Sequence, residues 1–125
     1  MSLYGMMRTG SSGMNAQASR LSTVADNIAN SGTTGYKAAS AEFSSLLLPS
    51  VSGNYNSGAV QTDIRYGISN QGALQYTSSS TDLAINGDGY FIVQTTEGGF
   101  LFTRNGELSV SATGELVNND GYRLY

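Results

Sequence analysis

Apolar side chains recur along the first 30 residues at alternating steps of four and three positions. This alternation is a heptad pattern, which places one apolar stripe along one side of an α-helix. Ser2 is a candidate N-cap, and Gly32 is a candidate residue just beyond the C-terminal end of the helix. The pattern therefore predicts a helix from about Leu3 to Asn30. Its apolar stripe consists of Leu3, Met7, Met14, Leu21, Val24 and Ile28, with Gly10 and Gln17 at the two remaining heptad positions.

Three glycines, at positions 5, 10 and 13, lie inside this predicted helix. Each costs about 1 kcal/mol relative to alanine, and an isolated helix has little stability to offset that cost. We therefore expect the helix to be stable only when it packs against a partner. Gly10 and Gly13 also permit another backbone to approach closely, which favours a tightly packed bundle. The alternative is an ordinary amphipathic helix that lies on a sheet of its own domain.

Turn-forming residues dominate from residue 31 to about residue 71, as in the segments NSGTTGYK and PSVSGNYNSGAV. Hydrophobic periodicity is lost here, and Pro49, the only proline in the sequence, follows a short apolar run. A segment of this length is unusual for a loop inside a compact domain and is generally functional or a linker. We expect an extended connector with short strands.

From Gly72 onward, short apolar runs alternate with glycine-rich turn signals at close spacing. This pattern is typical of a meander of β-hairpins. Alternation places Phe91 and Val93 on one face of a strand and Tyr90 and Ile92 on the other, so we expect that strand to be covered on both sides. The predicted strands are GALQYT, DLAI, YFIVQT, FLFTR, ELSVS, ELVN and YRLY, and one predicted turn consists of Asn86, Gly87, Asp88 and Gly89.

Together these patterns predict an α+β protein with three parts. Residues 1–30 form a long coiled-coil-type helix of an inner domain, and residues 31–71 form the extended connector. Residues 72–125 form the start of an antiparallel, hairpin-rich middle domain.

Composition narrows the range of functions. Only 12% of the residues are charged and the formal net charge is -3, so the chain lacks the basic surface that nucleic-acid binding requires. The absence of cysteine and histidine excludes disulfides, thiolate chemistry, and the most common metal ligand and general base. Gly, Ser and Thr interrupt the N-terminal region, which lacks an apolar run long enough for a signal peptide or membrane helix. We expect neither membrane insertion nor a cleaved signal peptide.

The turn from Asn86 to Gly89 is the candidate metal site, because it holds an aspartate between two glycines. The further carboxylates and the closing glutamate of a calcium loop are missing, so we interpret it as a structural turn with no metal or cofactor. The carboxylates from Asp82 to Asp120 lie near predicted turns, where solvated acids are far more common than catalytic ones. Lys37, the only lysine, fits an exposed turn better than a Ser-Lys nucleophile pair. We therefore predict no catalytic residues.

Two segments on either side of the connector form a specific combination. The first is NIANSGTTGYK, a helix end rich in asparagine followed by a turn with an aromatic residue and a lysine. The second is DLAINGDGYFIV together with the downstream FTRNGELSVSATGELVNNDGYRLY. In this order, they resemble the N-terminal signature and the β-domain motif of the bacterial flagellar axial proteins, the family of rod, hook and hook-associated subunits. The signature residues are Asn27, Asn30, Thr33, Gly35, Tyr36 and Lys37.

The resemblance implies a structural subunit that leaves the cell through the flagellar type III export apparatus and polymerises into a helical tube. Within the family, the N-terminal region and connector are most similar to hook subunits, with distal rod subunits as the alternative. A hook acts as a flexible universal joint between rod and filament. The implied partners are neighbouring copies, rod proteins, hook–filament junction proteins, the hook cap and the export apparatus. The apolar stripe and the signature residues are the expected assembly interface.

One departure from the family pattern concerns the inner domain. The resemblance implies that the N-terminal helix pairs with a C-terminal helix, whereas this sequence stops in a predicted strand at GYRLY. We therefore expect this chain to be the N-terminal part of a larger subunit. The competing interpretation is a secreted β-domain that binds calcium or carbohydrate and uses the helix as an oligomerisation arm, and an enzyme ranks third.

Overall fold

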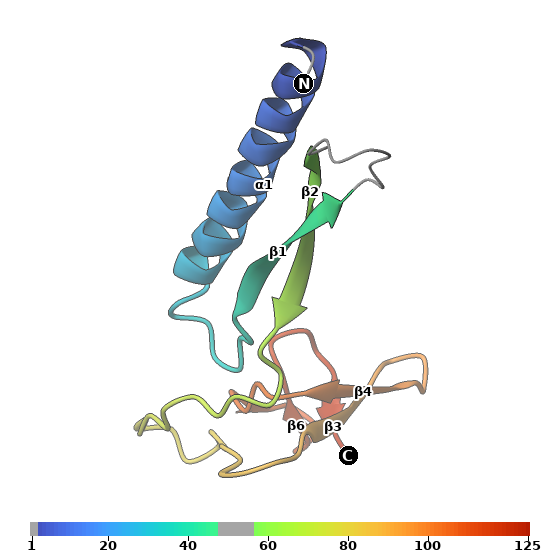
Figure 1. Ribbon diagram of the computed structural model, residues 1–125. Coiled ribbons are helices and arrows are strands. Elements are labelled where there is room, and N and C mark those ends of the chain that lie inside the picture. The colour runs from blue at the N-terminus through green and yellow to red at the C-terminus, as the bar shows by residue number, and fades with distance from the viewer. Residues whose placement is uncertain (1–2, 48–56) are drawn as a thin grey trace. The chain divides into compact units, whose positions relative to one another are not determined.

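The chain folds as one helix followed by antiparallel β-structure, which confirms the predicted α+β class (Figure 1). The computed structural model describes residues 3–47 and 57–125, so the candidate N-cap Ser2 and Pro49 lie outside the described residues. The elements are α1 (Leu3–Ala29), β1 (Ala39–Leu47), β2 (Ser57–Tyr66), β3 (Phe91–Gln94), β4 (Phe100–Thr103), β5 (Ser109–Val110), β6 (Leu116–Val117) and β7 (Arg123–Leu124).

These elements form two compact units. The helix–hairpin unit consists of Met1–Ser31 and Ala38–Ile68, and the β unit consists of Gly32–Lys37 and Ser69–Tyr125. The segment predicted as a connector therefore contributes to both units. Within the two described ranges, no helix has the long apolar stretch that crossing a bilayer requires.

The observed helix agrees closely with the heptad prediction, since it begins at Leu3 and ends at Ala29. Two further backbone bonds close its end, from Asn30 N to Asp26 O (3.0 Å) and from Ser31 N to Ile28 O (3.2 Å). Gly32 lies beyond the end of the helix, as predicted, but its φ is not in the left-handed region typical of a glycine at C′. The first glycine with a positive φ is Gly35, at +74°, because the backbone closes the helix before that point and turns later.

Strands β1 and β2 pair as an antiparallel hairpin of nine and ten residues, with Ala39 opposite Tyr66 and Ser45 opposite Val60. Opposite residues share a face, so the two faces of the hairpin can be compared directly. One face carries Ala39, Ala41, Phe43, Val60, Thr62, Ile64 and Tyr66. The other, the polar hairpin face, carries Ser40, Glu42, Ser44, Gln61, Asp63 and Arg65, all exposed.

The β unit contains one antiparallel sheet with the strand order β4-β3-β7-β6-β5. Its core is small and centres on Val93, which is fully buried opposite Leu101 and Leu124, and on the buried Leu108. Five of the seven predicted runs form these strands. The prediction of strands at GALQYT and DLAI is wrong: the exposed Leu74 and Tyr76 lie in irregular backbone, and Leu83 N bonds to Gly106 O (2.9 Å) outside any strand.

Strand β3 has the two faces that alternation predicts, but only one of them is buried. Val93 is 1% exposed, whereas Ile92 and Tyr90 are 38% and 43% exposed. The expectation that both faces are covered is wrong among the described residues, because a sheet that packs on one side within its own unit leaves the other side open.

Candidate assembly surface

Helix α1 lies along its own hairpin (Figure 1). The residues that it buries are small and do not belong to the apolar stripe. Ala16 and Thr23 are its buried residues, with 4% and 5% of their surfaces exposed. Small residues allow the helix backbone to approach the strands closely. The small-residue face, as we call this side of α1, consists of the buried or half-buried Gly5, Thr9, Ser12, Gly13, Ala16, Ser19, Thr23 and Asn27.

Two side chains fasten this small-residue face to the hairpin, one to each strand. Ser12 Oγ accepts a hydrogen bond from Val60 N (2.9 Å) and donates one to Val60 O (3.3 Å). Asn27 Oδ1 accepts from Ala39 N (3.0 Å), and its Nδ2 donates to Ala39 O (2.7 Å). Each side chain therefore forms hydrogen bonds with both the N–H and the C=O of one strand residue, as a neighbouring strand would.

The spacing of these two clamps fits the geometry of both elements. Fifteen residues separate Ser12 from Asn27, which corresponds to a rise of about 22 Å along a helix. Six residues separate Ala39 from Ser45, the partner of Val60, which corresponds to about 20 Å along a strand. The helix and the hairpin therefore remain in register over the distance between the clamps.

The remaining hydroxyl groups on the small-residue face are satisfied within the helix. Thr9 Oγ1 donates to Gly5 O (3.0 Å), Ser19 Oγ to Asn15 O (3.1 Å) and Thr23 Oγ1 to Ser19 O (2.9 Å). Serine and threonine commonly bond back to the preceding turn in this way. The polar atoms of this face consequently add no unpaired group to the contact with the hairpin.

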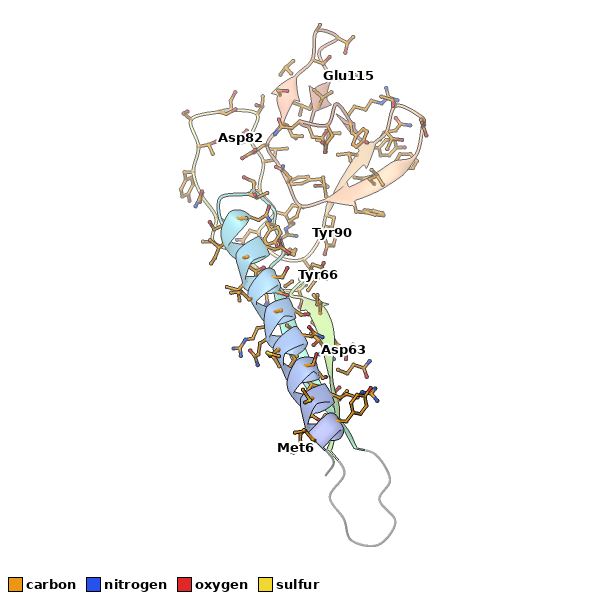
Figure 2. All side chains as sticks on the ribbon, turned by 90° about the horizontal axis from the view of Figure 1, so that it is seen from above. Met6, Asp63, Tyr66, Asp82, Tyr90 and Glu115 are labelled. Atoms are coloured by element: carbon orange, nitrogen blue, oxygen red, sulfur yellow. The ribbon has the colours of Figure 1, made fainter. Side chains whose placement is uncertain are left out.

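The apolar stripe lies on the side of α1 that does not face its own hairpin. Its six members are 44% to 73% exposed, with Leu21 at 70% and Ile28 at 69%. A β-carbon added at Gly10, which occupies a heptad position of the stripe, would meet nothing within 4 Å, so the space beside this glycine is open. The helix does lie on a sheet of its own unit, as the alternative interpretation expected. It presents its small-residue face to that sheet and leaves its apolar stripe exposed. In Figure 2, side chains project outward along α1.

Among the signature residues, only the first two belong to the helix–hairpin unit. Asn27 forms the clamp to Ala39, and Asn30 Nδ2 donates to Asp26 O (2.8 Å) at the end of the helix. Thr33, Gly35, Tyr36 and Lys37 belong to the β unit. The structure therefore divides the signature into two groups with different local environments.

The segment Gly32–Lys37 is fixed within the β unit by specific contacts. Thr34 Oγ1 donates to Glu107 Oε1 (2.6 Å), and the half-buried Lys37 donates from Nζ to Asn70 O (2.7 Å). Gly35 passes so close to the backbone that an added β-carbon would lie 2.7 Å from Asn105 N. Thr34 and Asn105 were not anticipated from the sequence, because their partners lie about 70 positions away and no local pattern indicates them.

The side chain of Arg104 holds the turn from Asn86 to Gly89 in place. Gly87 and Gly89 have φ values of +114° and +133°, which only glycine adopts easily. The guanidinium of Arg104 donates to the backbone oxygens of Gly87 and Gly89 and to Ile85 O (3.0 Å). It also donates to Gln71 Oε1 (2.6 Å). The carbonyl oxygens that a calcium ion would need are thus bound to an arginine.

No group of three His, Cys, Asp or Glu side chains able to hold a metal occurs in the part of the chain that the structure describes. Three carboxylates of the β unit each contact a different side chain. Glu107 accepts from Thr34, Asp82 Oδ2 accepts from Thr77 (2.7 Å), and Glu115 pairs with Arg123 (3.2 Å). These carboxylates are bonded individually and do not form an acid–base pair.

Comparison with known proteins gives consistent matches at both ends of the chain. Residues 7–37 match the family described as flagella basal body rod protein, and residues 84–125 match the flagellar hook protein FlgE/F/G D1 domain. Over 99% of its length, the chain is 64% identical to the flagellar hook protein FlgE of Brucella abortus and 60% identical to that of Rhizobium meliloti. It spans 31% and 30% of these two relatives.

Relatives named as rod proteins are less similar. The flagellar basal-body rod protein FlgG of Agrobacterium fabrum is 39% identical over 90% of this chain, which spans 48% of that relative. The similarity to hook relatives is therefore both higher in identity and more extensive along this chain.

Proposed function

Because this chain belongs to the flagellar hook and basal-body rod protein family, we propose that it is the N-terminal assembly region of a hook subunit, which polymerises into a helical tube. Identity of 60% to 64% to hook relatives along 99% of the chain supports the hook over the distal rod. The relatives are named as hook and rod proteins, which supports a structural role without catalysis.

The observation that carries this proposal is the orientation of α1. A helix that uses small residues toward its own hairpin and exposes a continuous heptad stripe is suited to pair with another helix. The proposed occupant of the stripe is a C-terminal helix of the same full-length subunit, as the family resemblance implies, and this helix pairs with α1 when the subunit assembles. The chain spans 31% and 30% of two hook relatives and 48% of a rod relative, and the remaining length of those relatives has room for such a helix.

The polar hairpin face suits contacts between subunits that slide when a tube bends. Its ion pair, Arg65 Nε to Glu42 Oε2 (3.2 Å), joins side chains that are 73% and 54% exposed, so it adds little stability. Polar, solvated groups exchange partners at low cost. The proposed subunit thus combines a fixed apolar contact through α1 with adaptable contacts elsewhere, which is what a universal joint that transmits torque requires.

We further propose how the subunit reaches the assembly. The subunit leaves the cell through the type III export apparatus without a cleaved signal peptide, and it assembles outside the cell beneath the hook cap. Its partners in the finished structure are neighbouring copies, rod proteins and hook–filament junction proteins. The proposed assembly interface consists of the apolar stripe and the signature residues Asn27, Asn30, Thr33, Gly35, Tyr36 and Lys37. The four signature residues of the β unit contribute by fixing the turn at residues 32–37.

The decisive experiment is polymerisation of the full-length protein carrying Leu21→Asp or Ile28→Asp. Both side chains are about 70% exposed, so the substitutions leave the β unit folded while placing a charge on the apolar stripe. Ser22→Asp is the matched control, because Ser22 is exposed and adjacent but lies off the stripe. We expect loss of polymer for the stripe variants only. Normal polymerisation of Leu21→Asp and Ile28→Asp would refute the proposed role.

Calcium titration tests the rival interpretation of the chain as a calcium-binding β-domain. Tight, stoichiometric heat of binding that depends on Asp88 would support a calcium-binding β-domain instead. We expect no such heat, since Arg104 already binds the carbonyl oxygens of the turn.

A further inference from the structure

The apolar stripe contains two methionines, Met7 and Met14, one heptad apart. These residues are 66% and 70% exposed, which places them within reach of small oxidants in the unassembled chain. Both occupy positions at the centre of the face that would contact a partner helix, whereas Met6, 55% exposed, flanks it. Methionine is readily converted to its sulfoxide when exposed.

We propose that Met7 and Met14 are a peroxide-sensitive modification site, at which oxidation of the unassembled subunit prevents helix pairing. This inference rests on the proposed function, because it requires the apolar stripe to be an assembly contact. Once the stripe is covered in the polymer, both sulfurs are protected from the same oxidant.

The chemistry needs only hydrogen peroxide or an organic hydroperoxide. The thioether sulfur attacks one peroxide oxygen, the O–O bond breaks as the S–O bond forms, and a proton transfer releases water or an alcohol. The sulfur loses two electrons and the peroxide gains them. The product is a polar, chiral sulfoxide in place of a flexible apolar group.

The surroundings of the two sulfurs explain why the sulfoxide is harmful. The stripe positions one turn from Met7 are Leu3 and Gly10, which bring no side-chain hydrogen-bond donor into the contact. Burying a polar sulfoxide oxygen against an apolar partner there is therefore costly. Polar side chains lie one turn from both methionines, Tyr4 and Ser11 near Met7 and Gln17 near Met14, so we expect oxidation at either site to weaken assembly.

The test treats the full-length monomeric protein with hydrogen peroxide, locates each added oxygen by peptide mass spectrometry, and measures polymerisation. We expect the critical concentration for polymerisation to rise at least about tenfold. Reduction by methionine sulfoxide reductases is expected to restore it. The double variant Met7→Leu/Met14→Leu is expected to polymerise normally before and after peroxide, whereas Met6→Leu keeps the sensitivity of the wild type.

The outcomes distinguish this inference from the proposed function. If Leu21→Asp blocks polymerisation but wild-type protein oxidised at both methionines polymerises like reduced protein, the inference is overturned and the proposed function stands. If the double leucine variant remains sensitive to peroxide, the inference is likewise wrong. If Leu21→Asp itself polymerises normally, the proposed function fails.

Discussion

Asn27 clamps Ala39 in both directions: its side-chain nitrogen donates to Ala39 O at 2.7 Å, and its side-chain oxygen accepts from Ala39 N at 3.0 Å. The amide of asparagine has one donor group and one acceptor group in fixed geometry, which matches the pair of groups on an extended residue. A residue of the family signature therefore joins the end of α1 to the start of β1. This contact locates a structural role for one asparagine of the signature.

Replacing Asn27 by alanine should loosen the helix–hairpin unit. Two half-buried backbone groups of Ala39 lose their partners, which costs about 1–3 kcal/mol of local stability. The readout is amide hydrogen exchange at Ala39 in the full-length protein. Asn15→Ala is the control, because Asn15 is an exposed asparagine of the same helix. Equal exchange at Ala39 in both variants would contradict the clamp.

Ser12→Ala should have a parallel effect at the other clamp, with faster exchange at Val60 N and little change at Ala39 N. Ser11→Ala serves as its control, since Ser11 is adjacent but exposed. Because the two clamps are far apart and share no partner, their effects on stability should add. Marked non-additivity in the double variant Ser12→Ala/Asn27→Ala would mean that the helix releases the hairpin as a single unit.

Gly35→Ala should destabilise the β unit more than an ordinary glycine substitution. A left-handed φ costs about 1–2 kcal/mol for a residue with a β-carbon, and Gly35 has φ +74°. The added carbon would also lie 2.7 Å from Asn105 N and 2.8 Å from Arg104 C, both backbone atoms with little room to move.

Gly114→Ala isolates the conformational part of that cost. Gly114 has φ +84° but nothing within 4 Å of an added β-carbon. Thermal unfolding of the β unit should therefore show a modest loss for Gly114→Ala and a larger one for Gly35→Ala. Equal losses would show that the close approach to Asn105 is unimportant.

Arg104→Met should release the turn from Asn86 to Gly89. The substitution keeps an unbranched side chain but removes the guanidinium that bonds the backbone oxygens of Ile85, Gly87 and Gly89, while Ile85 O keeps its hydrogen bond from Gln71 Nε2 (3.2 Å). Hydrogen bonds to a charged group contribute about 1.5–3 kcal/mol each at most sites, and the exposed ones less. Arg123→Met is the control, because the guanidinium of Arg123 bonds the side chains of Gln94 and Glu115 rather than the backbone oxygens of a turn. Amide exchange at residues 85–91 should rise for Arg104→Met alone.

Local patterns in the sequence were sufficient for the elements but not for their contacts. The heptad spacing located α1 to within one residue, and five of the seven apolar runs became strands. The same spacing could not indicate which face of α1 meets its own hairpin, because the hairpin packs on small and hydroxyl side chains such as Ala16 and Thr23, which a heptad pattern of apolar residues does not mark. Likewise, no pattern near Gly35 in the sequence indicates that Asn105 lies beside it. The close approach of the Asn105 backbone, which favours a glycine at position 35, is therefore visible only in the fold.

The last prediction concerns the stability of α1 before assembly. The helix carries three interior glycines, each costing about 1 kcal/mol, and it buries only Ala16 and Thr23 against the hairpin. Regions with few buried apolar contacts open readily. Amide exchange across residues 3–29 should therefore be fast in the full-length monomer and slow in the polymer, where the apolar stripe is covered. The amide of the fully buried Val93 is the internal control and should be protected in both states. Strong protection of α1 in the monomer would mean that the hairpin alone stabilises the helix and that the stripe is not needed to hold it.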